Sequence, residues 1–150
     1  SLEVSRREGF AAYVAVQNHY NLVEREEYER DARPVAEAEG LASLPYWSLA
    51  SGFLTGKYRP GNLAESARQG SAAKYLDDPR GPRVLEALDA VAAAHDVQVA
   101  SVALAWLRQQ PTVVAPIASA RTVEQLPALL ASMDLELDAD ELAALERASR

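Results

Sequence analysis

The residues best suited to chemistry lie in one stretch, from Leu44 to Tyr58, which reads LPYWSLASGFLTGKY. Its first part suits an extended strand that carries the aromatic residues Tyr46 and Trp47. Small and hydroxyl-bearing residues follow, and they let a backbone approach a bulky ligand closely. Lys57 then adds a positive charge beside the exposed N–H groups. Since amides and a cation both favour anions, the stretch predicts a turn that holds an aromatic ring joined to phosphates, as in a dinucleotide.

Composition alone leaves a second interpretation open at the aromatic and amide positions. Tyr46 can be a core aromatic residue at the end of a buried strand, and composition by itself favours that role. Gln17 can be a polar strand end that faces water, although its amide both donates and accepts hydrogen bonds and so suits a ligand amide. The residues alone therefore do not decide between packing and binding.

A second candidate anion site lies near residue 122. Ser119, Arg121 and Gln125 flank a helix start predicted at Thr122, where free N–H groups and the helix dipole favour an anion. The alternative is an ordinary capping box, formed by Thr122 and Gln125, beside a solvated arginine.

Three segments together resemble the aldo-keto reductase family. Residues 44–58 are similar to the family's strand-seven turn, whose usual wording is close to Y-S-P-L-x-x-G-x-L-T-G-K-Y. The segment from Gln17 to Leu22 resembles the strand-six signature, and the segment from Pro116 to Leu126 resembles the strand-eight exit. They occur in the family's order and spacing, and the resemblance covers essentially the whole chain, from the helix before strand six to the terminal helix.

The resemblance implies that this segment binds NADP. It implies that Tyr46 stacks on the nicotinamide ring and that Gln17 hydrogen-bonds the carboxamide. It also implies that Arg121, with Lys57 as a second cation, favours NADP over NAD. The cofactor-binding residues that it implies are Gln17, Tyr46, Trp47, Leu49, Ser51, Lys57, Ser119, Arg121 and Gln125.

The chain departs from the family pattern at two places. Trp47 and Ser48 stand where the family often has Ser-Pro, so a side-chain hydroxyl contact at residue 47 is lost while backbone contacts remain. Ala128 and Leu129 stand where the family often has Glu-Asn, which removes the side chains that contact adenine and ribose.

The motifs that carry the family's proton-transfer residues are absent from this sequence, and none of its six Tyr residues lies in the context of the catalytic one. Aldo-keto reductases transfer hydride from nicotinamide to a carbonyl carbon while a Tyr donates a proton, helped by Lys, Asp and often His, and those motifs lie on the first four strands. We therefore assign no catalytic residue and no metal ligand; His19 has the residue type of a general base, but in the resemblance it is an incidental member of the signature.

Two functions follow. The first is the C-terminal portion of an NADP-dependent oxidoreductase that reduces small-molecule aldehydes or ketones when its N-terminal half is present, this chain alone being inactive. The alternative is a non-catalytic fragment or assembly subunit that binds dinucleotide weakly or not at all.

The elements that must position these residues follow a strand, helix, strand pattern with short links, which is typical of α/β proteins. Residues 13–16 predict a strand, and Asn21 with Glu24 predicts a capping box for a helix that runs to about Glu39. Gly40 fits a left-handed C-cap before the next strand. By resemblance the fold is the C-terminal half of a (β/α)8 TIM barrel, with parallel strands and flanking helices.

The remaining pattern is mainly helical. A helix over residues 1–9 should stop at Gly9, and Asp138 should cap the last helix. The stretch from Tyr58 to Pro82 has weak periodicity and predicts a functional loop or mobile segment. Further elements are predicted as helices at 84–92, 99–107 and 126–133, and a strand at 113–117.

Bulk properties indicate one globular unit over residues 1–150. The 150 residues, 49% hydrophobic and 25% charged, can bury a core but fall short of the roughly 250 residues of a complete barrel. The absence of cysteine, of an apolar run of membrane-spanning length and of a signal-like start predicts a soluble cytoplasmic protein with no membrane partner. The net charge of −7 argues against nucleic-acid binding.

A half barrel would expose the edges of its opened sheet. Because unpaired edges tend to find partners, we expect self-association or pairing with the complementary N-terminal half.

Overall fold

The computed structural model describes residues 1–59, 61–63 and 69–150. Part of the segment predicted as a weakly patterned loop, residues 60 and 64–68, lies outside the described residues. In chain order the elements are α1 (Leu2–Glu8), β1 (Ala15–Val16), η1 (Tyr28–Ala32), α2 (Arg33–Glu39), β2 (Ala42–Ser43), η2 (Ala50–Thr55), β3 (Tyr58–Arg59), β4 (Asn62–Leu63), α3 (Gln69–Asp77), α4 (Arg80–His95), α5 (Val99–Arg108), η3 (Val123–Gln125), α6 (Leu126–Asp134) and α7 (Ala139–Ala148). The structure is thus of the α/β class and mostly helical.

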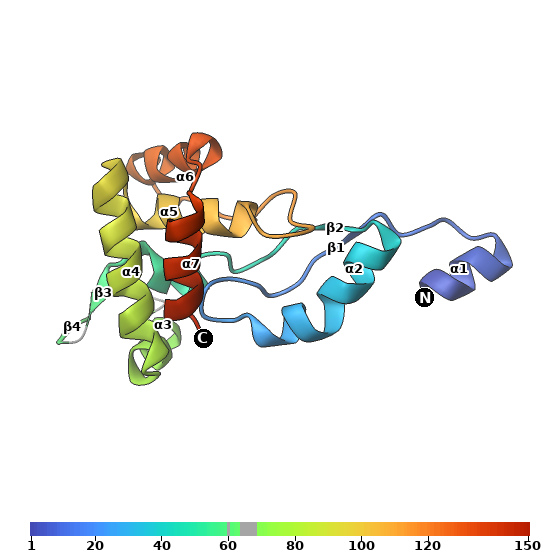
Figure 1. Cartoon of the computed structure of the whole chain (residues 1–150), viewed down its shortest axis with the longest axis horizontal. Helices are drawn as coiled ribbons and strands as arrows, with labels where there is room; N and C mark the ends of the chain where they lie inside the picture. Colours follow the sequence, from blue (N-terminus) through green and yellow to red (C-terminus); the bar gives the residue numbers. More distant parts are fainter. Residues whose placement is uncertain (60, 64–68) are drawn as a thin grey trace.

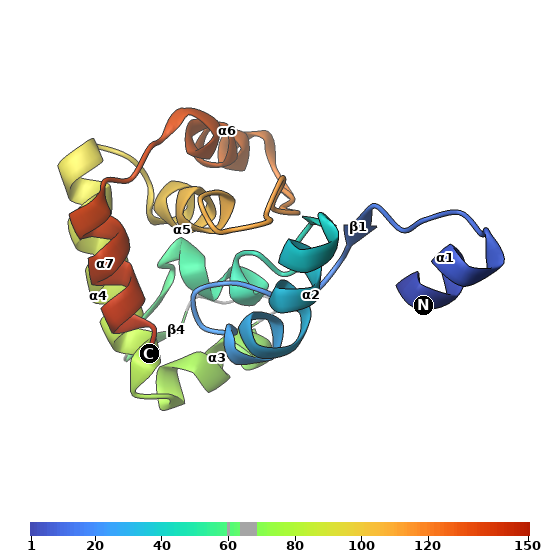
Figure 2. The same cartoon turned by 45° about the vertical axis from the view of Figure 1, so that its right-hand side comes forward.

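Most helices gather at one end of an elongated molecule. Figure 1 shows α3 to α7 together at the left, α2 beside the paired strands, and α1 alone at the far right. After a turn of 45°, α1 still lies apart from the other helices (Figure 2). An extended segment that includes Phe10, Tyr13 and Val14, all exposed, separates α1 from the body.

Three extended segments run parallel and side by side. β1 pairs with β2 in parallel, with Ala15 opposite Ala42, and Ser43 forms a parallel bridge to Val113. The pairing continues past the strand ends, since the Tyr46 N–H donates to the Asn18 carbonyl at 2.9 Å. The predicted order of three parallel segments is therefore confirmed. Their predicted length is wrong, because β1 and β2 cover only two residues each and, within residues 113–117, only Val113 forms a bridge.

Local end signals of the helices are confirmed where they involve only near neighbours. Gly9 and Gly40 adopt left-handed conformations, with φ of 70° and 65°, and end α1 and α2 as predicted. Asp138 caps α7, because its carboxylate accepts hydrogen bonds from the N–H groups of Asp140 and Glu141, both at 2.9 Å. The Glu141 side chain completes this capping box by accepting the Asp138 N–H.

The capping box predicted at Asn21 is wrong. Asn21 Oδ1 does accept the N–H of Glu24 at 3.0 Å, but the first helical residue is Glu26. The Glu24 carboxylate turns away and accepts hydrogen bonds from Lys74 and Tyr75, so it does not return to the Asn21 backbone. A tertiary partner has replaced the local one.

The capping box predicted at Thr122 is also wrong. Among the described residues the Thr122 side chain makes no cap hydrogen bond, and only the short 3-10 turn η3 begins there. Gln125 Oε1 accepts the Arg121 N–H at 2.9 Å instead. The loop predicted from Tyr58 to Pro82 is wrong over its second part, because α3 occupies most of it and α4 has already begun.

The core lies between the helices and the turn that follows β2. α5 is buried along most of its length, and α4 contributes an apolar stripe that includes Val84, Leu85 and Leu88. Aromatic rings meet at its centre, with Tyr20 4.7 Å from Tyr28 between ring centroids. Within the described ranges no single helix is long and apolar enough to cross a membrane; α4 and α5 reach that length only together, and they meet at a bend of 98°.

Candidate dinucleotide site

One cavity of about 490 Å³ opens between the turn after β2, the start of α5 and the segment that leads into α6. It collects eight of the nine residues predicted to bind cofactor. These are Tyr46, Trp47, Leu49, Ser51, Lys57, Ser119, Arg121 and Gln125. Residues from two segments about seventy positions apart therefore share one concave surface of the size that small-molecule sites usually have.

Gln17 is the ninth predicted residue, and it stands outside the described lining of this cavity. It is exposed and directly follows β1. The neighbouring backbone nevertheless reaches the cavity wall, because the Asn18 carbonyl accepts the N–H of Tyr46. Gln17 thus lies at the end of β1, and the cavity's aromatic residues follow the end of its partner strand β2.

The turn after β2 has an unusual backbone. Trp47, Ala50 and Ser51 have positive φ angles of 54°, 48° and 58°, and Gly52 follows at 92°. Residues with a side chain rarely adopt such angles, and where they do the strain tends to cluster at functional sites. Hydrogen bonds hold the turn, since the Ala50 N–H donates to the Trp47 carbonyl at 2.8 Å.

Glycine at residue 52 leaves room for the lysine of the turn. A Cβ at that position would lie 3.3 Å from Lys57 Cε and 3.4 Å from its Nζ. The Lys57 ammonium also lies 4.9 Å from the ring centroid of Tyr58. The absence of a side chain on Gly52 and the face of Tyr58 therefore bring the ammonium back over the turn, where it lines the cavity.

Ser48 fastens the turn to the third parallel segment. It is almost fully buried, and its Oγ lies 2.9 Å from the Ile117 carbonyl and 3.1 Å from the Pro45 carbonyl. A hydroxyl has one proton to donate, so the two carbonyls share it. The bond to Ile117 joins the two walls of the cavity.

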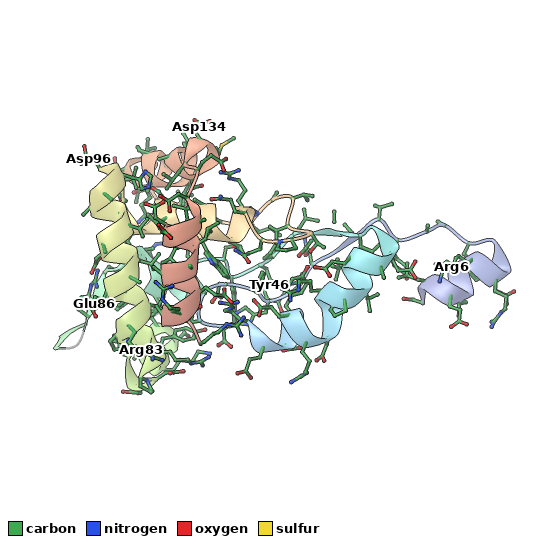
Figure 3. All side chains as sticks on the ribbon, viewed as in Figure 1. Arg6, Tyr46, Arg83, Glu86, Asp96 and Asp134 are labelled. Carbon is green, nitrogen blue, oxygen red and sulfur yellow. The ribbon has the colours of Figure 1, made fainter. Side chains whose placement is uncertain are left out.

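The aromatic residues stand partly free of the core. Tyr46 is 41% exposed and Trp47 is 57% exposed, so the interpretation of Tyr46 as a buried core residue is wrong. His19 stacks on Tyr46 with 5.6 Å between ring centroids and meets Trp47 edge-on at 5.1 Å. Figure 3 shows Tyr46 near the middle of the molecule, between α7 and α2 in that view. Contacts among the three rings thus hold Tyr46 and Trp47 in place, and both still expose surface that a ligand can contact.

Two positively charged side chains, Lys57 and Arg121, line the cavity. Within the part of the chain that the structure describes, neither Lys57 nor Arg121 takes part in an ion pair. Glu124 is the one acidic residue among the described lining. Its pKa is lowered, first because its carboxylate accepts its own backbone N–H and then because the Thr122 hydroxyl donates to it. The cavity therefore carries a net positive charge near neutral pH, which suits an anionic ligand.

Sequence reasoning missed the wall that α5 provides. Gln98 is the N-cap residue of α5, and it lines the cavity together with Ala100. A signal was available, since the apolar stripe that predicts this helix begins at Val99 and a helix start brings free N–H groups and a partial positive charge. Across the described residues no cluster of three or more His, Asp or Glu side chains is arranged to hold a metal ion.

Comparison with known proteins agrees with these observations. The sequence profile described as the Aldo/keto reductase family matches residues 1–150. The chain belongs to the aldo/keto reductase family. The resemblance seen in three segments is thereby confirmed, and the family's members are oxidoreductases that generally use NAD(P)H.

Several curated relatives match nearly all of the chain. Protein tas of Escherichia coli (strain K12) is 31% identical over 147 residues, which cover 97% of this chain and 42% of that protein. The uncharacterized oxidoreductase MT2355 of Mycobacterium tuberculosis is 39% identical over 142 residues, 91% of this chain and 42% of that protein. Aldo-keto reductase NECHADRAFT_45914 of Fusarium vanettenii is 32% identical over 146 residues, 95% of this chain and 38% of that protein. The chain spans about two-fifths of the length of these relatives.

Proposed function

We propose that this chain forms the C-terminal portion of an NADP-dependent aldo/keto reductase that reduces aldehydes or ketones in the cytoplasm, and that its cavity holds the dinucleotide. One observation carries the proposal. A single cavity combines exposed aromatic rings, a turn of small residues with a left-handed backbone, and two cations without an acidic partner among the described residues. A dinucleotide needs these three features, because it joins a planar ring to phosphates.

The proposed roles follow from the chemistry of each wall. The exposed ring of Tyr46 offers a stacking face for nicotinamide. Ser51 presents a hydroxyl and a left-handed backbone to the pyrophosphate. Lys57 and Arg121 supply positive charge for the phosphates, and a guanidinium is the better fit for a 2′-phosphate because it can donate two hydrogen bonds at once.

The other predicted residues complete the site. Ser119 and Gln125 supply hydrogen-bonding groups beside the arginine, and the Gln125 amide already orients the backbone at residue 121. Trp47 and Leu49 form apolar wall. Gln17, which directly follows β1, would donate and accept at the carboxamide of a stacked nicotinamide. When bound, the cofactor supplies hydride, and the residues of this chain bind and orient it.

We further propose that the three parallel segments are consecutive strands of a (β/α)8 barrel whose other strands lie outside this chain. Exposed apolar side chains at both open edges support this arrangement. Phe10, Tyr13 and Val14 lie beside β1, and Val114 and Ile117 lie in the third segment. Pairing with the complementary N-terminal half, or with a second copy, would cover them. A chain that stays monomeric at high concentration in light scattering would count against this association.

Titration with NADPH, followed by nicotinamide fluorescence, tests the cofactor site. Arg121→Ala should raise the dissociation constant for NADPH by about 10- to 100-fold, because a hydrogen bond to a charged group contributes about 1.5–3 kcal/mol. Affinity for NADH should change much less, since NADH lacks the 2′-phosphate. Arg7→Ala is a matched control, because Arg7 lies on α1, remote from the cavity, and pairs only with Glu8 among the described residues.

The result also decides between the two candidate functions. Equal NADPH affinity in wild type and Arg121→Ala would contradict the proposed phosphate contact. A wild-type chain that binds neither nucleotide would favour the alternative, in which the chain is a non-catalytic fragment or assembly subunit.

A further inference from the structure

The buried amide of Asn21 joins two distant parts of the chain. Asn21 is only 1% exposed, and both ends of its amide are engaged. Its Oδ1 accepts the N–H groups of Val23 at 2.9 Å and Glu24 at 3.0 Å. Its Nδ2 donates to the carbonyl oxygen of Trp47 at 3.0 Å, across 26 residues of sequence. The loop after β1 is therefore tied directly to the first residue of the strained turn.

Asn21 binds the carbonyl of a residue whose backbone conformation is unfavourable. Trp47 has a φ of 54°, which a residue with a bulky side chain adopts only where its surroundings impose it. Two donors fix its carbonyl, the Asn21 Nδ2 from one segment and the Ala50 N–H at 2.8 Å from within the turn. The bond to Ala50 is local to the turn, so Asn21 is the donor that links the Trp47 carbonyl to a segment outside the turn.

The same amide also contacts the aromatic cluster formed by His19, Tyr46 and Trp47. Asn21 Nδ2 lies 3.3 Å from His19 Nε2. The His19 ring in turn stacks on Tyr46 and meets Trp47 edge-on. Tyr46 and Trp47 line the cavity, whereas His19 and Asn21 lie outside its described lining. One amide thus holds both the backbone of the aromatic wall and the ring that packs behind it.

We propose that Asn21 is a positioning residue for dinucleotide binding: by holding the Trp47 carbonyl and the back of the His19 ring, it fixes the orientation of the Tyr46–Trp47 wall against which the nicotinamide end of the cofactor lies. The inference rests on the proposed function. Asn21 acts through Trp47 and His19 and touches no ligand itself. Losing its Nδ2 donor should let the residue 47 peptide relax toward negative φ and rotate the indole away from its present place.

Asn21→Asp is the direct test. Aspartate keeps the oxygen that accepts from Val23 and Glu24, but it replaces the donor that faces the Trp47 carbonyl with a second acceptor. We expect at least a tenfold rise in the dissociation constant for NADPH. We also expect the free chain to lose the part of its near-ultraviolet circular dichroism that Trp47 contributes, identified as the signal that Trp47→Phe removes.

Asn18→Asp is the matched control. Asn18 lies three residues earlier in the same segment, and its Oδ1 accepts the Ser43 hydroxyl at 2.8 Å. Its Nδ2 is buried and has no hydrogen-bond partner among the described residues. The same substitution there adds the same charge but breaks no bond to the turn, so NADPH affinity should stay within about twofold of wild type.

Testing Asn21→Asp in a chain that also carries Trp47→Gly separates a positioning role of Asn21 from a general effect on folding. Glycine adopts positive φ without a steric penalty, so Trp47→Gly removes the strain that Asn21 counteracts. In that background Asn21→Asp should weaken NADPH binding less than threefold. A loop-stabilising role alone would produce the same loss in both backgrounds. If Asn21→Asp does not fold, Asn21→Ser replaces it, because a serine hydroxyl can still accept from Val23 and Glu24 but is too short to reach Trp47.

The outcomes separate this inference from the proposed function. A wild-type chain that fails to bind NADPH overturns the proposed function, while the Trp47 signal of the free chain still decides the role of Asn21. An unchanged Trp47 signal in Asn21→Asp overturns the inference. So does an NADPH affinity equal to that of Asn18→Asp, or an equal loss with and without Trp47→Gly. A lost Trp47 signal together with a loss of affinity confined to the native Trp47 background supports it.

Discussion

Replacing the buried Arg25 with methionine should destabilise the chain strongly. Its side chain is 7% exposed and forms ion pairs with Glu29 and Glu146, each at 2.7 Å. It also donates to the Ser149 hydroxyl at 2.6 Å and lies 5.2 Å from the ring centroid of Trp106. One guanidinium therefore ties the segment after β1 to α7. Methionine fills a similar volume, so the substitution removes charge and hydrogen bonds more than packing.

The magnitude follows from what each partner can do afterwards. Removing one member of a buried ion pair costs about 3–5 kcal/mol, because the remaining charge is left without compensation. Glu146 is 35% exposed and keeps Arg150 as a partner, so it contributes little to that cost. Glu29 is 14% exposed and would keep only the Tyr20 hydroxyl, at 2.9 Å, among its described partners. We therefore expect Arg25→Met to lower the free energy of unfolding by the smaller value of that range, about 3 kcal/mol. For a chain of this size this corresponds to a melting temperature lower by about 6–12 °C.

Thermal and urea unfolding, followed by circular dichroism, measure this loss. Arg30→Met is the matched control, because Arg30 lies five residues further along and, among the described residues, pairs only with the exposed Asp31. That substitution should leave the melting temperature almost unchanged, since exposed pairs contribute little. In the Arg25→Met background, Glu29→Gln should restore more than half of the lost stability. This substitution removes the buried carboxylate that lost its cationic partner, while the amide oxygen of the new glutamine can still accept a hydrogen bond from the Tyr20 hydroxyl.

The acid dependence of stability gives a further check on the same cluster. The pKa of Glu146 is lowered below its ordinary value of 4.5, first because Arg25 donates hydrogen bonds to it. A carboxylate whose folded-state pKa is lower than its unfolded value stabilises the fold above the unfolded pKa. That contribution is lost as the pH falls through the folded pKa. Arg25→Met should therefore flatten the decline of stability below pH 4.5. A loss of stability no larger than that of Arg30→Met would refute the reasoning.

Two further predictions concern a glycine and a histidine. Gly81→Ala should destabilise the chain by about 3 kcal/mol, because the new Cβ would lie 1.7 Å from the Tyr75 carbonyl oxygen. Gly70→Ala, in α3 with no described atom within 4 Å of its Cβ, should be neutral or stabilising by up to about 1 kcal/mol; equal urea midpoints for the two variants would contradict this. Burial lowers the pKa of His19, so its folded-state pKa lies below its unfolded value and stability should fall as the pH drops through 6.5; an NMR titration midpoint at or above 6.5 would contradict it.

The sequence predicts those features whose causes lie within a few residues. The left-handed ends at Gly9 and Gly40 and the capping box at Asp138 involve partners no more than five positions away. Such interactions survive in almost any tertiary context. The capping boxes predicted at Asn21 and Thr122 have the same spacing but fail, because the side chains that would have closed them accept other hydrogen bonds. Glu24 accepts from the distant Lys74 and Tyr75, and Gln125 accepts from the nearby Arg121 N–H.

The site shows the same limit. The stretch from Leu44 to Tyr58 contains most of one wall, so its residue types and its resemblance to the family suffice to identify it. The wall from α5 was not predicted, because the apolar stripe that begins at Val99 predicts a helix but does not tell which other segments the start of that helix lies against. Asn18 and Asn21 are the same residue type three positions apart, yet one Nδ2 has no described partner and the other holds Trp47. Only the tertiary structure distinguishes them.

The orientation of the Asn21 amide is determined by its partners. The N–H groups of Val23 and Glu24 can only donate, so they must face Oδ1, and the Trp47 carbonyl can only accept, so it must face Nδ2. A reversed amide would lose all three bonds. His19 Nε2 must then accept from Nδ2, which places the proton of a neutral imidazole on Nδ1.

Protonating His19 would therefore oppose the hold of Asn21 on the turn. A proton on Nε2 would point at the Asn21 NH₂ group, and a donor cannot accept it. Burial is the first cause of the lowered His19 pKa, and Lys74 lowers it further, whereas the carboxylates of Glu24 and Glu27 raise it. Because the neutral ring is the form that Asn21 requires, the environment that disfavours His19 protonation also preserves the geometry of the aromatic wall at neutral pH.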